Sequence, residues 1–189
     1  MTRILTGDSS TQLWHELVRE GEARAHAALG EELESYLVFT LMRHYRDAPL
    51  AHRVMALELL EALQRDGGQR RDELRDVGDR CLLIAGLYPE LARRRRVPLR
   101  YFLELGQGAY DQLAQELRRA LATLYAQLAR AFNELVRVLV ELRRLSGEWA
   151  GLDPLERIAL ATRDGVVDPE AGAAQFDGAI VVAGTTRRH

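Results

Sequence analysis

The chain has 189 residues, of which 47% are hydrophobic and 6% aromatic, and its formal net charge is −2. That length suits one domain with a buried core, and the aliphatic, aromatic-poor composition favours a helical bundle over a β-sandwich. All 26 basic residues are arginines and there is one cysteine, which excludes lysine Schiff-base and P-loop chemistry, an intrachain disulfide and a multi-cysteine zinc site.

The lengths of the apolar runs indicate whether the sequence has a signal peptide or a membrane span. Residues 1–8 lack the apolar core of a signal peptide. No apolar run approaches the roughly 18 residues that a transmembrane helix needs. We therefore expect a cytoplasmic protein without a membrane span.

The first half of the chain predicts a series of helices. The first helix is interrupted at Gly21 and ends near Gly30. The second covers residues 31–45, and its centre is apolar nearly all round, which indicates a central position in the bundle. A third helix spans about residues 49–65, and a fourth starts near Gln69.

Residues 78–110 carry the most informative pattern. Every position in residues 81–88 is apolar or small, and the charged segment before them favours a buried helix over a strand. Pro89 ends or kinks this helix and opens a short helical turn. A new helix starts near Leu99, after a run of arginines.

Gly106 and Tyr110 lie four residues apart and share one face of that helix. The simpler interpretation is a tight helix crossing, in which a second backbone approaches Gly106 and Gly86 is the counterpart. The alternative is a ligand pocket, framed by Tyr88, Glu90, Tyr101 and Tyr110. Asp79 with Arg80 either contributes to a polar pocket or pairs with charges on neighbouring helices.

Short motifs along residues 78–139 form a recognisable order. They are residues 78–83, 85–90, 101–102, 105–106, 109–110 and 128–139. This order resembles an uncharacterised bacterial family of helical proteins, with a "GFFPE"-like turn, a "YY…MG…AY" helix and an "LA..F..LV.VL" helix. The resemblance covers about a third of the chain, and Leu87-Tyr88 stands where the family more often has two aromatics before the proline. It implies a helical fold and no particular activity.

The clearest periodicity runs from Leu117 to Leu145, where apolar residues recur alternately after four and three positions. A second apolar flank widens this face, which predicts one long helix in a multi-helix core rather than a two-stranded coiled coil. Arg130, Arg137 and Arg144 recur every seven residues and are expected to form a solvated stripe.

The predicted fold is all-α: a single-domain bundle of about six to seven helices over residues 1–163, in which the long helix is the penultimate one. A short last helix would run from Asp153 to about Thr162. Residues 164–189 are rich in glycine and small residues, so we expect an extended or disordered tail, or a segment that docks on a partner.

The sequence contains no catalytic motif. It lacks the Glu-x-x-His pairs of a di-iron bundle, a Gly-x-Ser-x-Gly elbow and a glycine-rich phosphate loop after a strand. Cys81 lies in an apolar run and is expected to be buried and inert. We therefore expect no catalytic residue, no cofactor and no metal site.

The run of arginines is the strongest charge feature. It consists of Arg93, Arg94, Arg95 and Arg96, and Arg100 follows closely. Such a run can bind phosphate, an anionic surface or nucleic acid. Glu90 and Glu104 would neutralise part of it, and the near-neutral chain as a whole does not indicate a nucleic-acid-binding protein.

Two classes of function stay open. The preferred hypothesis is a non-catalytic helical interaction or scaffold protein, with a protein partner or self-association, which predicts an exposed apolar patch and no buried polar cluster. The alternative is a small-ligand-binding protein or enzyme with a pocket between the 88–90 turn and the 101–110 helix, which predicts convergent polar groups with shifted pKa values. Anion or nucleic-acid binding through the arginine run is a second alternative.

Overall fold

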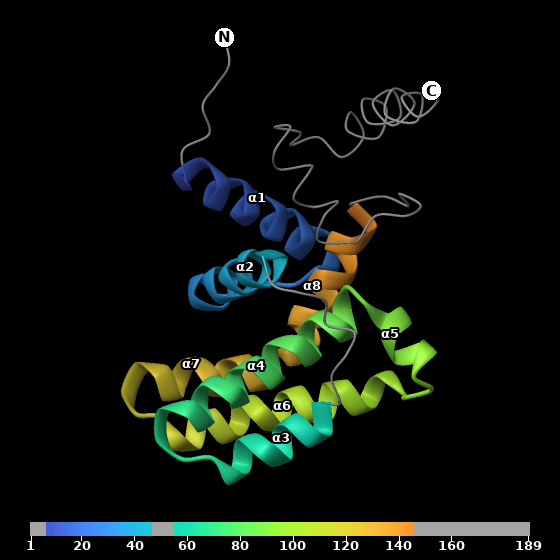
Figure 1. The fold of residues 1–189 in the computed structure, drawn as a ribbon. Helices are drawn as coiled ribbons and strands as arrows, with labels where there is room; N and C mark the ends of the chain where they lie inside the picture. The colour runs from blue at the N-terminus through green and yellow to red at the C-terminus, as the bar shows by residue number, and fades with distance from the viewer. Residues whose placement is uncertain (1–6, 47–54, 146–189) are drawn as a thin grey trace, which may run out of the picture.

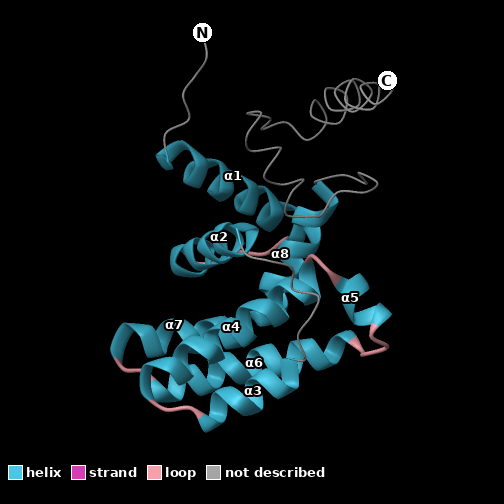
Figure 2. Cartoon of the chain, in the orientation of Figure 1, coloured by secondary structure: helices cyan, strands magenta, loops and turns pink. Residues whose placement is uncertain are grey.

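The computed structural model describes residues 7–46 and 55–145, and within these ranges it contains helices and no strand (Figures 1 and 2). The eight helices of this part are α1 (Gly7–Ala25), α2 (Glu31–Arg46), α3 (Met55–Gln64), α4 (Gly67–Gly86), α5 (Pro89–Arg94), α6 (Leu99–Glu116), α7 (Arg119–Arg130) and α8 (Phe132–Leu145). The predicted all-α bundle is confirmed, but the predicted number of about six to seven helices is wrong, because the segment from Leu117 to Leu145 forms two helices instead of one. The predicted helix at residues 153–162, the domain end at 163 and the tail at 164–189 lie outside the described residues.

The helices form two groups that α8 connects (Figure 1). In one group α4 packs against α3, α5 and α6, and α6 packs against α7. In the other group α1 packs against α2. Helix α8 contacts both α1 and α4, and α2 also reaches α7. The C-terminal half of α4 is therefore enclosed by neighbouring helices.

The buried run predicted in the middle of the sequence is confirmed. Residues 81–87 are all buried, and Tyr88 is half-buried. Leu82 and Leu83 are completely excluded from solvent. A helix segment that is apolar all round has no solvent face to offer, so it becomes the centre of the core.

The two glycines expected to pair across a helix crossing face different partners. A Cβ on Gly106 would lie 2.3 Å from Phe132 Cζ, whereas a Cβ on Gly86 would lie 2.4 Å from Leu139 Cβ. Close approach at Gly106 is therefore confirmed, but the pairing with Gly86 is wrong. Each glycine instead leaves a notch that a side chain of α8 fills.

Gly21 does not interrupt the first helix, and that prediction is wrong. Helix α1 continues through Gly21 to Ala25, because Gly21 is buried against α8, where a Cβ would lie 3.1 Å from Leu142 Cγ. The helix ends before the predicted Gly30, at the point where His26 adopts a left-handed backbone with φ 49°.

The long helix predicted from Leu117 to Leu145 is divided in the structure. Helix α6 ends at Glu116, α7 starts at Arg119, and Ala131 separates α7 from α8. The hydrogen-bond ladder continues across this break, since Ala131 N donates to Gln127 O at 2.8 Å. A heptad pattern specifies which residues share a face, but it does not require that the helix axis is straight. Figure 1 shows that the chain changes direction between α7 and α8.

Candidate functional site

A fully buried carboxylate, Asp79, lies on α4 between three helices. The hydroxyls of Tyr36 on α2 and Tyr110 on α6 both donate to Asp79 Oδ1 at 2.7 Å. Arg43 of α2 donates to Asp79 Oδ2 and forms an ion pair with it. We call Asp79, Tyr36, Arg43 and Tyr110 the Asp79 cluster. The interaction hypothesis predicted no buried polar cluster, and that prediction is wrong.

The sequence builds this cluster from local spacing. Tyr36 and Arg43 are seven residues apart, so both project from the same side of α2. Gly78 precedes Asp79 and makes room for the ring of Tyr110, since a Cβ at Gly78 would lie 2.4 Å from Tyr110 Cε1. The glycine thus seats the ring whose hydroxyl reaches the neighbouring carboxylate.

Aromatic rings surround the carboxylate. The ring of Tyr36 meets those of Tyr110 and Tyr125 edge-on, with centroids 6.1 Å and 5.8 Å apart. Tyr110 also contacts Phe132, at a centroid distance of 5.8 Å. Edge-to-face contacts of this kind are favourable beyond the area that they bury. The Asp79 carboxylate therefore lies beside a group of packed aromatic rings, while the Arg43 side chain stays 36% exposed.

Burial governs the protonation of the cluster. It raises the pKa of Asp79, while Arg43 and the two tyrosine hydroxyls partly offset this effect by stabilising the charged carboxylate. Burial and the charge of Asp79 raise the pKa values of Tyr36 and Tyr110 well above the usual value for tyrosine. Both hydroxyls therefore stay protonated and act as hydrogen-bond donors, which suits a structural joint between helices.

Next to the cluster, α2 carries buried polar atoms without a hydrogen-bond partner in the described part of the chain. They are Thr40 Oγ1, Arg43 Nε and His44 Nε2. Thr40 is completely buried and His44 is 6% exposed. Burial lowers the pKa of His44, so the imidazole is neutral near pH 7. The α2 side of this interface therefore holds unused hydrogen-bonding capacity.

A second polar joint holds the opposite side of α2. Glu34 is buried, accepts a hydrogen bond from Arg19 Nε at 3.0 Å and lies 2.9 Å from His15 Nδ1. Both partners belong to α1. Helix α2 is thus tied through polar groups to α1 on one side and to Asp79 of α4 on the other, and Tyr110 of α6 bonds to the same carboxylate.

The remaining predicted site residues lie elsewhere. Tyr88 and Tyr101 are half-buried, and the Tyr101 ring packs edge-on against Phe102 with centroids 5.2 Å apart. Glu90 is exposed on α5 and pairs with Arg93. The other arginines of the run, Arg94, Arg95 and Arg96, are exposed as well. Of the predicted residues, the structure brings Asp79 and Tyr110 together in the core and leaves Glu90 and the arginines on the surface.

Sequence reasoning missed the contribution of α2 to this site. Tyr36, Thr40 and His44 recur every four residues inside a segment whose composition predicts an apolar core helix. That spacing places them on one face, and a polar stripe on a central helix is a detectable signal for a polar partner. Cys81 is buried as predicted, and burial raises the pKa of its thiol far above the usual value, which keeps it inert.

Comparison of the chain with protein-family models, curated proteins and solved structures finds no match. The resemblance to a bacterial helical family therefore stays a prediction. Within residues 7–46 and 55–145, no helix is long and apolar enough to cross a membrane. The same ranges contain no group of three or more His, Cys, Asp or Glu side chains arranged to hold a metal ion.

Proposed function

We propose that this protein is a non-catalytic helical adaptor that binds another protein through the outer face of α3. The observation that carries the proposal is the exposure of three leucines on this helix. Leu57 is 54% exposed, Leu60 58% and Leu63 36%. We call these residues the α3 leucine stripe. Water contact with large apolar side chains is unfavourable, and adjacent exposed ones are typical of a binding surface.

The opposite side of α3 already fulfils its packing role. Ala62 is completely buried and Leu59 packs against the core, while α3 as a whole contacts α4 and α6. Leu57 and Leu60 are three residues apart and therefore neighbours on the outward face. The other large exposed hydrophobic residues of the described chain, Phe39, Leu99 and Leu121, lie on three different helices. The stripe is thus a local concentration of apolar surface.

The charge beside the stripe indicates the kind of partner. Glu61 is exposed and follows Leu57 by four residues, so its carboxylate belongs to the same outward face. A symmetric contact between two α3 helices would bring Glu61 close to its own copy, which like-charge repulsion opposes. The stripe instead suits an amphipathic helix of another protein whose apolar face is flanked by lysine or arginine.

The Asp79 cluster supports a structural role more than a ligand site. It has the convergent polar groups and shifted pKa values that the ligand-binding alternative predicted. However, both carboxylate oxygens of Asp79 already accept hydrogen bonds from the protein. The leucines on the outer face of α3, which are exposed among the described residues, are the better basis for a function.

A photo-crosslinking residue at position 60, introduced in the host organism, tests the proposal. We expect an adduct with a distinct protein that contains a basic amphipathic helix, and no such adduct from the matched exposed position Arg137 on α8. A peptide of that helix should bind the purified protein, and Glu61→Lys should weaken binding at least about tenfold, because it replaces attraction by repulsion.

Three outcomes would overturn the proposal. An adduct with residues 146–189 of the same chain would show that the stripe has an internal occupant. A crosslinked homodimer would show self-association. Peptide binding that is indifferent to Glu61→Lys would remove the charge argument for a basic helix.

A further inference from the structure

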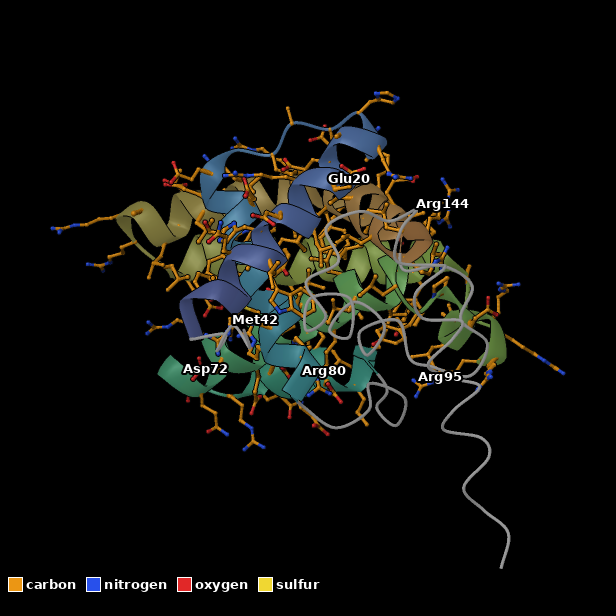
Figure 3. The ribbon with its side chains drawn as sticks, turned by 90° about the horizontal axis from the view of Figure 1, so that it is seen from above. Glu20, Met42, Asp72, Arg80, Arg95 and Arg144 are labelled. Atoms are coloured by element: carbon orange, nitrogen blue, oxygen red, sulfur yellow. The ribbon has the colours of Figure 1, made fainter. Side chains whose placement is uncertain are left out.

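The connection between α5 and α6 forms a projecting corner of the molecule. Helix α5 ends in a tight turn, where Arg96 adopts a left-handed backbone with φ 54° and its N–H donates to Arg93 O at 3.0 Å. Val97 and Pro98 then lead into α6. Figure 1 shows α5 and this turn at the edge of the bundle, and Figure 3 shows Arg95 on the opposite side of the molecule from Asp72. We call residues 93–100 the α5–α6 corner.

The corner carries a concentration of exposed positive charge. Residues 90–104 contain five arginines and two glutamates. Glu90 pairs with Arg93, and Glu104 pairs with Arg100 at 3.2 Å, but these side chains are 61–82% exposed and such surface pairs are weak. Arg94 and Arg96 make no ion pair with any described residue. The guanidinium groups of Arg94 and Arg96 are therefore available to an anionic surface.

An apolar tip lies among these arginines. Pro98 is exposed and Leu99 is 37% exposed, directly between Arg96 and Arg100 in the chain. A basic surface with an apolar tip is the combination by which peripheral proteins hold an anionic bilayer: the cations meet headgroup phosphates, and the apolar residues enter the boundary with the acyl chains.

The same geometry is less suited to nucleic acid. Single-stranded nucleic acid binds to aromatic faces within a positively charged groove. Here the nearest tyrosine, Tyr101, is half-buried and packs edge-on against Phe102. The arginines lie on a projecting corner, and a projecting corner can meet a flat bilayer without any groove.

We propose that the α5–α6 corner docks this protein on anionic lipid bilayers, with its arginines on headgroup phosphates and Pro98 and Leu99 at the acyl boundary. This surface is different from the α3 leucine stripe, and the inference does not depend on the function proposed for that stripe. Attachment of this kind is peripheral and needs no membrane-spanning helix.

Co-sedimentation of the full chain with lipid vesicles tests this inference. We expect binding to phosphatidylcholine vesicles that contain phosphatidylglycerol, none to phosphatidylcholine alone, and weaker binding as salt concentration rises. Each arginine near an anionic surface contributes about fivefold to affinity. Arg94→Glu combined with Arg96→Glu should therefore reduce binding by about 25-fold or more, and Leu99→Ser should reduce it severalfold.

A charge-matched variant provides the control. Arg137→Glu combined with Arg144→Glu makes the same change in net charge on α8, where both side chains are more than half exposed. We expect this variant to keep most of its vesicle binding, and thermal unfolding of each variant should show that all of them fold.

The inference is overturned if the two double variants lose binding equally, since the attraction would then reflect net charge alone. Equal binding to vesicles with and without phosphatidylglycerol would also overturn it, as would no vesicle binding at all. Binding to single-stranded RNA that is lost in Arg94→Glu/Arg96→Glu, without vesicle binding, would assign the corner to nucleic acid instead.

Discussion

Two kinds of interface hold the described helices together. In the first kind, a glycine receives a side chain of a neighbouring helix: Gly78 of α4 receives Tyr110 of α6, Gly86 of α4 receives Leu139 of α8, and Gly106 of α6 receives Phe132 of α8. Helix α2 is tied to its neighbours through polar groups, at Glu34 on one side and at Asp79 on the other. The first kind depends on shape and the second on charge and hydrogen bonds.

The difference shows how each helix obtains its position. A side chain that fills a notch fixes the distance and register of two helices by packing alone, and pH has little effect on it. A buried carboxylate adds little net stability by itself, because the cost of removing it from water offsets most of its attraction to its partners. Once it is removed, however, the partner groups are left without an acceptor, which is unfavourable. The placement of α2 is therefore specific, and it is sensitive to single substitutions and to protonation.

The largest expected effect is that of Asp79→Ala. It leaves two tyrosine hydroxyls without their acceptor, and each such unsatisfied donor costs about 1–3 kcal/mol of unfolding free energy, whereas Arg43 is 36% exposed and can turn to solvent. Chemical denaturation measures this change. Asp72→Ala on the same helix is the control, because its side chain is 71% exposed in a pair with Arg75, and such a pair contributes less than about 1 kcal/mol. If Asp79→Ala and Asp72→Ala lowered the unfolding free energy equally, the Asp79 cluster would contribute no more than a surface ion pair.

Tyr110→Phe tests a single hydrogen bond within the cluster. The ring stays in the notch at Gly78, but the donor to Asp79 is lost, and a hydrogen bond to a charged group contributes about 1.5–3 kcal/mol. Tyr101→Phe is the matched control on the same helix, because its half-buried hydroxyl makes no hydrogen bond to any described residue. The two unfolding free energies should differ clearly, and similar values would mean that the ring alone matters.

The notch interface is tested by two glycines of α6 that are two residues apart. Gly106→Ala would place a Cβ 2.3 Å from Phe132 Cζ and 2.9 Å from Cys81 Cβ, so we expect a net loss of about 1–2 kcal/mol despite the better helix propensity of alanine. At Gly108 nothing lies within 4 Å, so Gly108→Ala should increase stability by up to about 1 kcal/mol. If both substitutions changed the unfolding free energy in the same direction, the close packing of Phe132 against Gly106 would not explain the effect.

Helices could be predicted from the sequence where residues close together in the chain determine them. Helical periodicity, Pro89 and the apolar run at residues 81–87 predicted most helices and the centre of the core. The break at Ala131 was not predictable in this way, because the apolar pattern continues through it while α7 and α8 pack on different neighbours. Periodicity reports which face is buried, not which partner covers it.

The Asp79 cluster was out of reach for the same reason. Asp79 was recognised as a candidate, but its partners Tyr36 and Tyr110 lie 43 and 31 residues away in the chain. The four-residue spacing of Tyr36, Thr40 and His44 indicates a polar partner for α2, but it does not identify that partner as Asp79. The notch at Gly78 was equally hidden, because a glycine in a helix only lowers helix propensity until the ring that fills it is known.

The smallest expected effect concerns pH and arises from His44. Burial lowers the pKa of this imidazole, whereas in the unfolded chain it titrates near its ordinary value of 6.5. Below about pH 6.5 the unfolded chain binds a proton that the folded protein binds less readily, so stability falls as the pH decreases. Asp79 acts in the opposite sense, since its raised pKa lets the folded protein take up a proton first and gain stability on acidification.

Comparison of the wild type with His44→Gln separates these opposing contributions. All other residues, Asp79 included, are the same in both proteins, so their contributions largely cancel. We expect the wild type to lose stability relative to the variant between about pH 7 and pH 5, because only the wild type has an imidazole to protonate at this interface. The charged groups that affect this imidazole are Arg43 on α2 and Asp76, Asp79 and Arg80 on α4. If the two stability curves ran parallel through this range, the interface of α2 with α4 would be as indifferent to pH as the glycine notches of α6 and α8.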